Sequence, residues 1–307
     1  MTDMYVKKKT LMLILSDVCV AECEVCYGSC SPKNNNIMDE ALMLGAIRQA
    51  KEKGLAEYIA FGGGEPFVHY DLLKTGLEHA KKAGLETSVC TNGFWGKWSD
   101  GEIAEKIGTL PIDSVVFRTS AYHEKFVPET DFSRAVEHFK KMRLPLFLEI
   151  GETKSSESAV DFFNDKLGDY KYLCNLMIFP FLREGKARGL GADCFQRLVR
   201  TEDARCVSEN IISVRYDGEV FPCCGSLRYD SAFSMGNASR RGLSEIIGEN
   251  AAFLSFLGGS GALQKMILTA KDSMEFPDFC IDGCEICRSI MENKEIRKRL
   301  TDGGSAV

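Results

Sequence analysis

The sequence lacks long hydrophobic runs and a strong charge of one sign. Near the N-terminus the apolar run after the lysines spans only Leu11 to Leu15, and no small-residue cleavage site follows it. This excludes a signal peptide and a membrane span. The 38 basic and 44 acidic residues are mixed along the chain and give a net charge of −6. The charge therefore predicts binding to neither nucleic acid nor membrane, and we expect a cytoplasmic protein.

The sequence also lacks internal repeats, low-complexity tracts and the Gly-Lys-Ser/Thr element of a phosphate-binding loop. Its 307 residues are enough for one large domain with a smaller one attached. Cysteine, in contrast, is abundant, with 13 residues. Because the cytoplasm keeps thiols reduced, so many cysteines favour metal ligation over a disulfide framework.

Apolar, β-rich segments alternate with amphipathic segments over the first two thirds of the chain. The expected strands are 10–15, 58–62, 86–91, 114–119, 144–150 and 172–179, and the expected helices are 39–54, 70–84, 99–108, 131–142 and 158–168. Strands joined by helical crossovers run parallel. Since six such units fall short of the eight in a closed barrel, the sequence predicts an α/β fold with a partial (β/α)6 barrel.

This alternation stops near Arg205. A short strand pair follows around an Asp217–Gly218 turn, and after it come a long helical stretch and a cysteine-rich segment that begins at Cys280. We therefore expect two domains, the barrel over residues 1–205 and a smaller domain over residues 206–307.

The densest cysteine group follows the first expected strand. Cys19, Cys23 and Cys26 have the spacing C-x3-C-x2-C, and Tyr27 comes directly after them. Ligand sites of parallel sheets lie at the carboxyl ends of strands. Structural zinc usually takes four ligands, often in two separated pairs, whereas three close thiolates suit three irons of a cubane cluster whose fourth iron stays open. We interpret Cys30, which follows this complete set, as a free thiol.

These features resemble those of the radical S-adenosylmethionine (SAM) enzymes. The cysteine motif of the family is matched at Cys19, Cys23, Cys26 and Tyr27, and its Gly-Gly-Glu motif after the second strand is matched at residues 63–65. Glycines allow a strand to bring its backbone against the amino group of a ligand. The resemblance therefore implies that SAM is bound by Tyr27, Gly63, Gly64 and Glu65, with Glu65 accepting from the amine.

The resemblance also implies the chemistry and its cofactors. SAM binds the open iron of a [4Fe–4S] cluster, one electron cleaves it, and the resulting 5′-deoxyadenosyl radical removes a hydrogen atom from substrate. An external reductant, flavodoxin or ferredoxin, is then required. Ser120, which follows the fourth strand, and Arg183, past the sixth, are further expected SAM contacts. For Arg183 an exposed side chain without a role is the alternative.

The C-terminal cysteines resemble the SPASM and twitch auxiliary-cluster domains. Cys206 and Cys223 match the opening of such a domain, and a C-x2-C pair follows. Because the longer cysteine series of a full SPASM domain is not reproduced, the resemblance implies the twitch type with one auxiliary [4Fe–4S] cluster. Its expected ligands are Cys206, Cys223, Cys284 and Cys287, with Cys280, Cys194 and Cys174 as substitutes. A zinc ribbon is the alternative.

Three functional hypotheses follow from this resemblance. The first is an enzyme that modifies a ribosomally synthesised peptide by epimerisation or crosslinking. The second is a radical SAM dehydrogenase or lyase acting on a small molecule such as a sugar or aminocyclitol. The third is a noncatalytic iron–sulfur or zinc protein, against which the Gly-Gly-Glu motif argues.

Cys224 directly follows the expected ligand Cys223. Because adjacent residues of a strand point to opposite faces, a cluster-facing Cys223 predicts that Cys224 faces the barrel. A thiol there could return a hydrogen atom to the opposite face of a peptide α-carbon, as in some peptide epimerases of this architecture. A spare ligand or a buried small residue is the alternative for Cys224.

Overall fold

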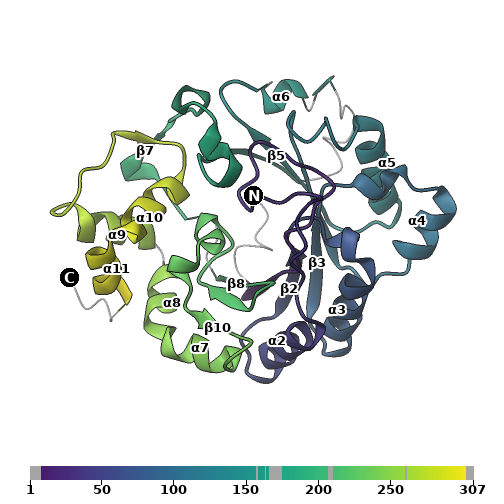
Figure 1. The fold of residues 1–307 in the computed structure, drawn as a ribbon, viewed down its shortest axis with the longest axis horizontal. Coiled ribbons are helices and arrows are strands. Elements are labelled where there is room, and N and C mark those ends of the chain that lie inside the picture. The colour runs from purple at the N-terminus through teal and green to yellow at the C-terminus, as the bar shows by residue number, and fades with distance from the viewer. Residues whose placement is uncertain are drawn as a thin grey trace.

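The computed structural model describes residues 8–156, 158–162, 164–165, 175–206, 210–259 and 261–301. Its central element is a nine-stranded sheet with the order β10-β9-β8-β1-β2-β3-β4-β5-β6 (Figure 1). The six expected barrel strands are present and each runs parallel to its neighbour. They are β1 (Thr10–Ile14), β2 (Tyr58–Gly62), β3 (Glu86–Thr91), β4 (Ser114–Thr119), β5 (Leu146–Glu152) and β6 (Asn175–Pro180). The predicted partial (β/α)6 barrel is confirmed.

Helices connect the strands and cover the outside of the curved sheet, as Figure 1 shows. They are α2 (Glu40–Glu52), α3 (Tyr70–Lys82), α4 (Asp100–Lys106), α5 (Glu129–Lys141) and α6 (Ala159–Phe162). Local signals fix where they begin: the Asp39 side chain caps α2, and Ser99 and Glu102 form a capping box at α4. The expected helix residues beyond 165 and the expected strand residues 172–174 lie outside the described part of the chain.

Alternation along the strands divides the side chains between two faces of the sheet. Leu11, Leu13 and Leu15 belong to the large core under the helices, as do Val115 and Phe117 of β4. Successive side chains of a strand point to opposite faces. The intervening residues, such as Met12 on β1 and Arg118 on β4, therefore face the concave interior of the barrel.

The predicted hairpin is confirmed, and it extends the barrel sheet. Strand β8 (Ile211–Arg215) pairs with β1 in parallel, and β9 (Glu219–Phe221) pairs with β8 in antiparallel fashion around a turn at Gly218, whose φ is +85°. Strand β10 (Gly236–Asn237) completes this side. The hairpin covers the edge of β1 that the six barrel strands leave open, so the sheet continues across the proposed domain boundary at residue 206.

The C-terminal helices pack around a second core. They are α7 (Leu243–Glu249), α8 (Ala251–Leu257), α9 (Ala262–Ala270), α10 (Gly283–Glu292) and α11 (Lys294–Thr301). Their buried side chains include Leu263, Met266 and Ile290, together with Leu227 from the segment after β9. In the described part of the chain, no single helix is long and apolar enough to cross a membrane; α8 and α9 meet such a criterion only as a pair bent by 105°.

Candidate active site

The loop that carries the first three cysteines lies directly on the Gly-Gly-Glu segment after β2. The Gly64 amide donates to the Ser16 carbonyl at 2.7 Å, and the Glu65 amide donates to the Val18 carbonyl at 2.8 Å. A Cβ atom on Gly64 would lie 1.9 Å from the Val18 oxygen. The close approach of the cysteine loop therefore requires a glycine here, in addition to the approach of a ligand that we expected.

Glu65 is almost completely buried, with 1% of its surface exposed. One carboxylate oxygen accepts from the Thr91 hydroxyl at 2.8 Å, and the other accepts from the Asn92 amide at 2.7 Å. Burial raises the pKa of Glu65 to about 7, against the effect of these donors. Both oxygens are thus already bonded within the protein, and Glu65 ties the end of β2 to the end of β3. Among the described residues, Oε2 accepts from the Asn92 amide alone, so it can accept a further donor, and the SAM-amine contact that we expected for Glu65 stays a prediction.

The thiols of the cysteine loop lie at the carboxyl edge of the sheet. Asn92, after β3, directs its side-chain amide at the Cys19 sulfur, with an Nδ2–Sγ distance of 3.6 Å. A hydrogen bond from Cys30 lowers the pKa of Cys26 to about 6, while burial raises the pKa of Cys23 to about 12. Cys30, expected as a free thiol, is buried and donates its backbone amide to the Cys26 sulfur at 3.3 Å.

Tyr27 joins the cysteine loop to the segment after β6. Its hydroxyl accepts from the Leu182 amide at 2.7 Å and donates to the Pro180 carbonyl at 3.4 Å. Its ring meets the Phe181 ring edge-on, with centroids 6.1 Å apart. Tyr27 therefore joins the cysteine loop to the segment after β6, in addition to the SAM contact that we expected for it. The nearby Arg183 side chain is exposed.

Ser120 is fully buried after the end of β4. Its hydroxyl accepts from the Tyr122 amide at 3.2 Å and lies 2.8 Å from Nδ1 of His123. With the hydroxyl donating to Nδ1, the ring is neutral and carries its proton on Nε2. Burial and the Arg118 charge lower the pKa of His123 to about 4, which favours this neutral form.

The four expected ligands of the auxiliary cluster line one cavity of about 540 Å³. Cys206 precedes β8, Cys223 follows β9, and Cys284 and Cys287 lie one turn apart on α10. Gly225 also lines the cavity, and a Cβ on it would lie 3.2 Å from the Cys284 sulfur and 3.8 Å from the Cys223 sulfur. Asp282 caps α10 by accepting from the Cys284 amide at 2.8 Å, which fixes the start of the C-x2-C turn.

This arrangement fits a cluster better than a single ion. In the described part of the chain, no three Cys, His, Asp or Glu side chains converge as ligands of one metal ion. An iron–sulfur cluster tolerates more widely spaced thiols because each cysteine binds a different iron. Four thiols around one cavity therefore suit a [4Fe–4S] group.

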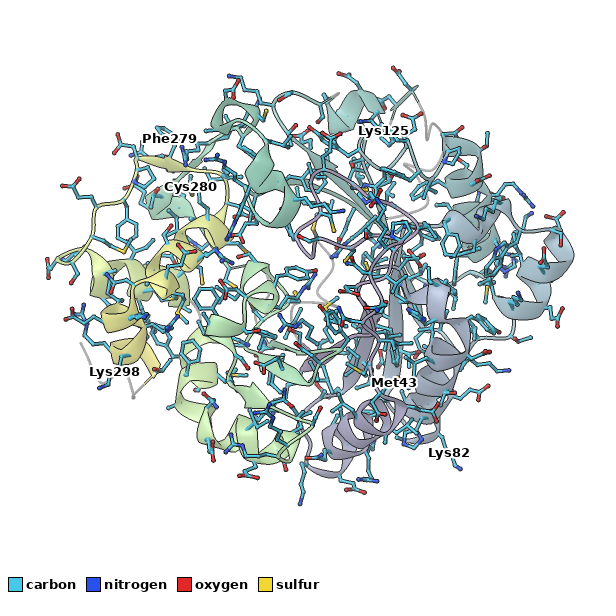
Figure 2. The ribbon with its side chains drawn as sticks, viewed as in Figure 1. Met43, Lys82, Lys125, Phe279, Cys280 and Lys298 are labelled. Atoms are coloured by element: carbon cyan, nitrogen blue, oxygen red, sulfur yellow. The ribbon has the colours of Figure 1, made fainter. Side chains whose placement is uncertain are left out.

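The substitute ligands lie elsewhere. Cys280 is buried on β11 (Phe279–Cys280), which pairs with β7 (Val199–Arg200), and it lies near the outer edge of the C-terminal part in Figure 2. Its polar neighbours are Thr201 and Glu285, and it does not line the auxiliary cavity. Cys194 does not line that cavity either. Cys174 lies outside the described residues.

Cys224 occupies a position different from the one that strand alternation assumed. Strand β9 ends at Phe221, so Cys223 and Cys224 lie in the irregular segment after it. The two residues are nevertheless separated: Cys223 lines the auxiliary cavity and Cys224 does not. The Cys224 carbonyl accepts from Arg228, whose guanidinium reaches Met12 at 3.4 Å from its sulfur. Cys224 is thus held beside the barrel interior.

Sequence reasoning missed the buried arginines of the site. Arg288, next to Cys287 on α10, pairs with Glu184, Asp230 and Glu292 at 2.9 Å each. Glu292 lies one turn along the same helix, but Glu184 and Asp230 come from distant segments, so no local pattern indicates the whole network. It fixes α10 to the segment after β6 and to the loop after β9.

Comparisons with known proteins agree with this geometry. A family model described as the radical SAM superfamily matches residues 13–144, and one described as an iron–sulfur cluster-binding domain, SPASM, matches residues 206–285. The chain is 23% identical over 300 residues to a putative peptide biosynthesis protein, YydG, of Bacillus subtilis strain 168, covering 94% of this chain and 93% of that protein.

Solved structures share the fold. SAM-bound anSMEcpe superposes with a TM-score of 0.58 at 16% identity, over 95% of this chain and 98% of that one. SAM-bound SuiB of Streptococcus suis superposes with a TM-score of 0.54 at 14% identity, over 78% of this chain and 65% of that one. The chain therefore spans just under two thirds of SuiB.

Proposed function

Because the chain belongs to the radical SAM superfamily and carries a SPASM-type iron–sulfur domain, we propose that it modifies a ribosomally synthesised peptide. The main support is YydG, a putative peptide biosynthesis protein that matches the chain over nearly its full length. In addition, anSMEcpe, which shares the fold with a TM-score of 0.52, has been solved with a bound peptide.

The cofactors are SAM, the SAM-binding [4Fe–4S] cluster and an auxiliary cluster. When bound at the first cluster and supplied with one electron from the reductant, SAM would yield methionine and the 5′-deoxyadenosyl radical that abstracts a hydrogen atom from the substrate. In our proposal Cys19, Cys23 and Cys26 hold the first cluster, and the four cysteines of the auxiliary cavity hold the second. Our proposal includes a cytoplasmic location and flavodoxin or ferredoxin as the reductant.

The remaining SAM contacts are assigned by position. In our proposal Tyr27, Gly63, Gly64 and Glu65 contact SAM, with Glu65 accepting from the SAM amine through the oxygen that also accepts from the Asn92 amide. Ser120 stands at the same edge of the sheet, after β4. Arg183 is kept as a weaker assignment, since its side chain is exposed.

For the reaction outcome we propose epimerisation, with Cys224 as the hydrogen-atom donor. Transfer of the hydrogen atom from its thiol to the radical at the peptide α-carbon forms a carbon–hydrogen bond and leaves a thiyl radical on Cys224. One electron from the reductant and one proton from water restore the thiol. The supporting observation is that Cys224, unlike Cys223, lies outside the auxiliary cavity and is held by Arg228 beside the barrel interior.

The test uses heavy water and small peptides encoded next to the gene. The wild-type enzyme should yield an epimerised peptide that carries one deuterium at the α-carbon, and Cys224→Ala should still form 5′-deoxyadenosine without that product. Cys90→Ala is the matched control, because Cys90 is a second thiol on an interior position of β3. Normal deuterated product from Cys224→Ala would refute the donor assignment, and unmodified peptides with the wild-type enzyme would refute peptide modification.

A further inference from the structure

Arg228 is a buried cation without a counterion. It lies in the short 3-10 helix Ser226–Tyr229 after β9 and keeps 5% of its surface exposed. Its guanidinium donates to neutral acceptors: the Cys224 carbonyl, the Tyr229 hydroxyl at 2.5 Å and the Met12 sulfur at 3.4 Å. Among the described residues, its Nε–H has no hydrogen-bond partner. No carboxylate of those residues forms an ion pair with the guanidinium.

This guanidinium lies within the barrel interior. Met12 occupies an interior position of β1. Its methyl group packs against Gly62 at the end of β2, where an added Cβ would lie only 2.7 Å from it. Arg118, on an interior position of β4, is close enough for its charge to act on Arg228. Two cations from opposite sides of the barrel therefore face the same space.

The carboxylates around this space do not balance the two cations. Glu149 on β5 stands opposite Arg118 in the sheet register and forms an ion pair with it. Glu65 is bonded to Thr91 and Asn92 instead. Cys90 and Tyr229, two further ionisable groups of this space, are held neutral because burial raises the pKa of each. Among the described residues, no carboxylate is therefore left to pair with Arg228.

A buried charge is strongly unfavourable unless it is paired. A guanidinium with a free Nε–H beside its Nη groups presents the fork that a carboxylate binds in a bidentate manner. The barrel interior can therefore bind an anion at Arg228, next to the segment that contains Cys224.

We propose that Arg228, assisted by Arg118, binds a carboxylate of the substrate beside the reacting carbon. The inference rests on the proposed function and narrows its substrate class to peptides with an acidic side chain or a free C-terminal carboxylate at or next to the modified residue. SAM also carries a carboxylate. Arg228 donates to the carbonyl of Cys224, the residue proposed to react with the substrate, and this contact favours the substrate carboxylate; the SAM-affinity measurement below distinguishes the two sources.

The experiment measures binding of two small probes to the enzyme with both clusters and SAM bound. The probes are N-acetylglutamate N-methylamide and its glutamine counterpart, which differ only in the carboxylate. By anaerobic calorimetry the glutamate probe should bind at least tenfold more tightly. Arg228→Met should abolish this preference, Arg228→Lys should retain part of it, and Arg240→Met, which removes an exposed arginine, should leave it unchanged.

Several outcomes would overturn the inference. Equal binding of the two probes to the wild type, no measurable binding of the glutamate probe, or an unchanged preference in Arg228→Met would each do so. A loss of SAM affinity in Arg228→Met equal to the loss for the probe would assign the carboxylate to SAM. A shifted reduction potential of the auxiliary cluster with an unchanged probe preference would assign Arg228 to the cluster.

These results separate the inference from the function on which it rests. Probe binding requires no turnover, so a retained glutamate preference with no modified peptide would refute peptide modification alone. A modified peptide without any glutamate preference would refute the carboxylate site alone. Iron content of each variant shows that it has folded around its clusters.

Discussion

Replacing Gly64 by alanine should detach the cysteine loop from the sheet without unfolding the rest of the protein. The new Cβ would lie 1.9 Å from the Val18 carbonyl oxygen and 2.9 Å from the Val18 amide nitrogen. Both are backbone atoms, so the loop itself must move. The movement breaks the two hydrogen bonds that join Gly64 and Glu65 to the loop. At about 1 kcal/mol each, plus about 1–3 kcal/mol for overpacking, the total cost is about 3–5 kcal/mol.

We expect this destabilisation to affect only the SAM-binding cluster, because the cysteine loop that moves contains its three ligands. Anaerobically reconstituted Gly64→Ala should lose about four irons and all SAM cleavage, while the auxiliary cluster, about four further irons, stays bound. Iron analysis and electron paramagnetic resonance measure both. Gly45→Ala is the control: it lies in α2 with no atom within 4 Å of the added Cβ, and should gain about 1 kcal/mol of stability. Full iron content and unchanged stability in Gly64→Ala would refute the steric argument.

Three further predictions concern other parts of the site. Burial raises the pKa of Glu65 from 4.5 to about 7. The protonated form therefore stabilises the fold fully below pH 4.5, and roughly 3 kcal/mol of the free energy of unfolding is lost as the pH rises through 7. Urea unfolding curves of Glu65→Gln should lack this pH dependence, and an equal dependence in both proteins would contradict the prediction. Cys284→Ser should lose the auxiliary irons and Cys280→Ser should keep them, because of these two residues only Cys284 lines the cavity. Iron loss in Cys280→Ser instead would reverse the ligand assignment. Tyr27→Phe should lower the free energy of unfolding by about 1 kcal/mol through the lost Leu182 hydrogen bond; no change by urea titration would count against this bond.

The fold was largely predictable because its signals are local. Apolar segments such as 10–15 and 114–119 alternate with capped amphipathic helices, and each confirmed element follows from neighbouring residues. The cysteine spacing likewise lies within one loop. The pairing of β8 with β1 was not predicted, because it joins residues 10–14 to residues 211–215 and no local pattern encodes a sheet neighbour at that separation.

The role of individual site residues was less predictable for the same physical reason. Glu65 stands in a recognisable motif, yet its hydrogen-bond partners Thr91 and Asn92 come from another strand. Arg228 has no distinguishing sequence context, and its burial without a carboxylate depends on Met12 and Cys224. Motifs identify which residues carry chemistry, whereas their contacts depend on packing between distant segments.

We propose that this chain cleaves SAM at a cluster held by Cys19, Cys23 and Cys26, with a second cluster in the C-terminal cavity. The most direct measurement is 5′-deoxyadenosine formation, by chromatography and mass spectrometry, from anaerobically reconstituted protein with SAM and dithionite. The wild type should form it and hold about eight irons, and the variant with all three cysteines changed to alanine should form none and hold about four. 5′-Deoxyadenosine from that variant, or its absence with a fully loaded wild type, would contradict the account.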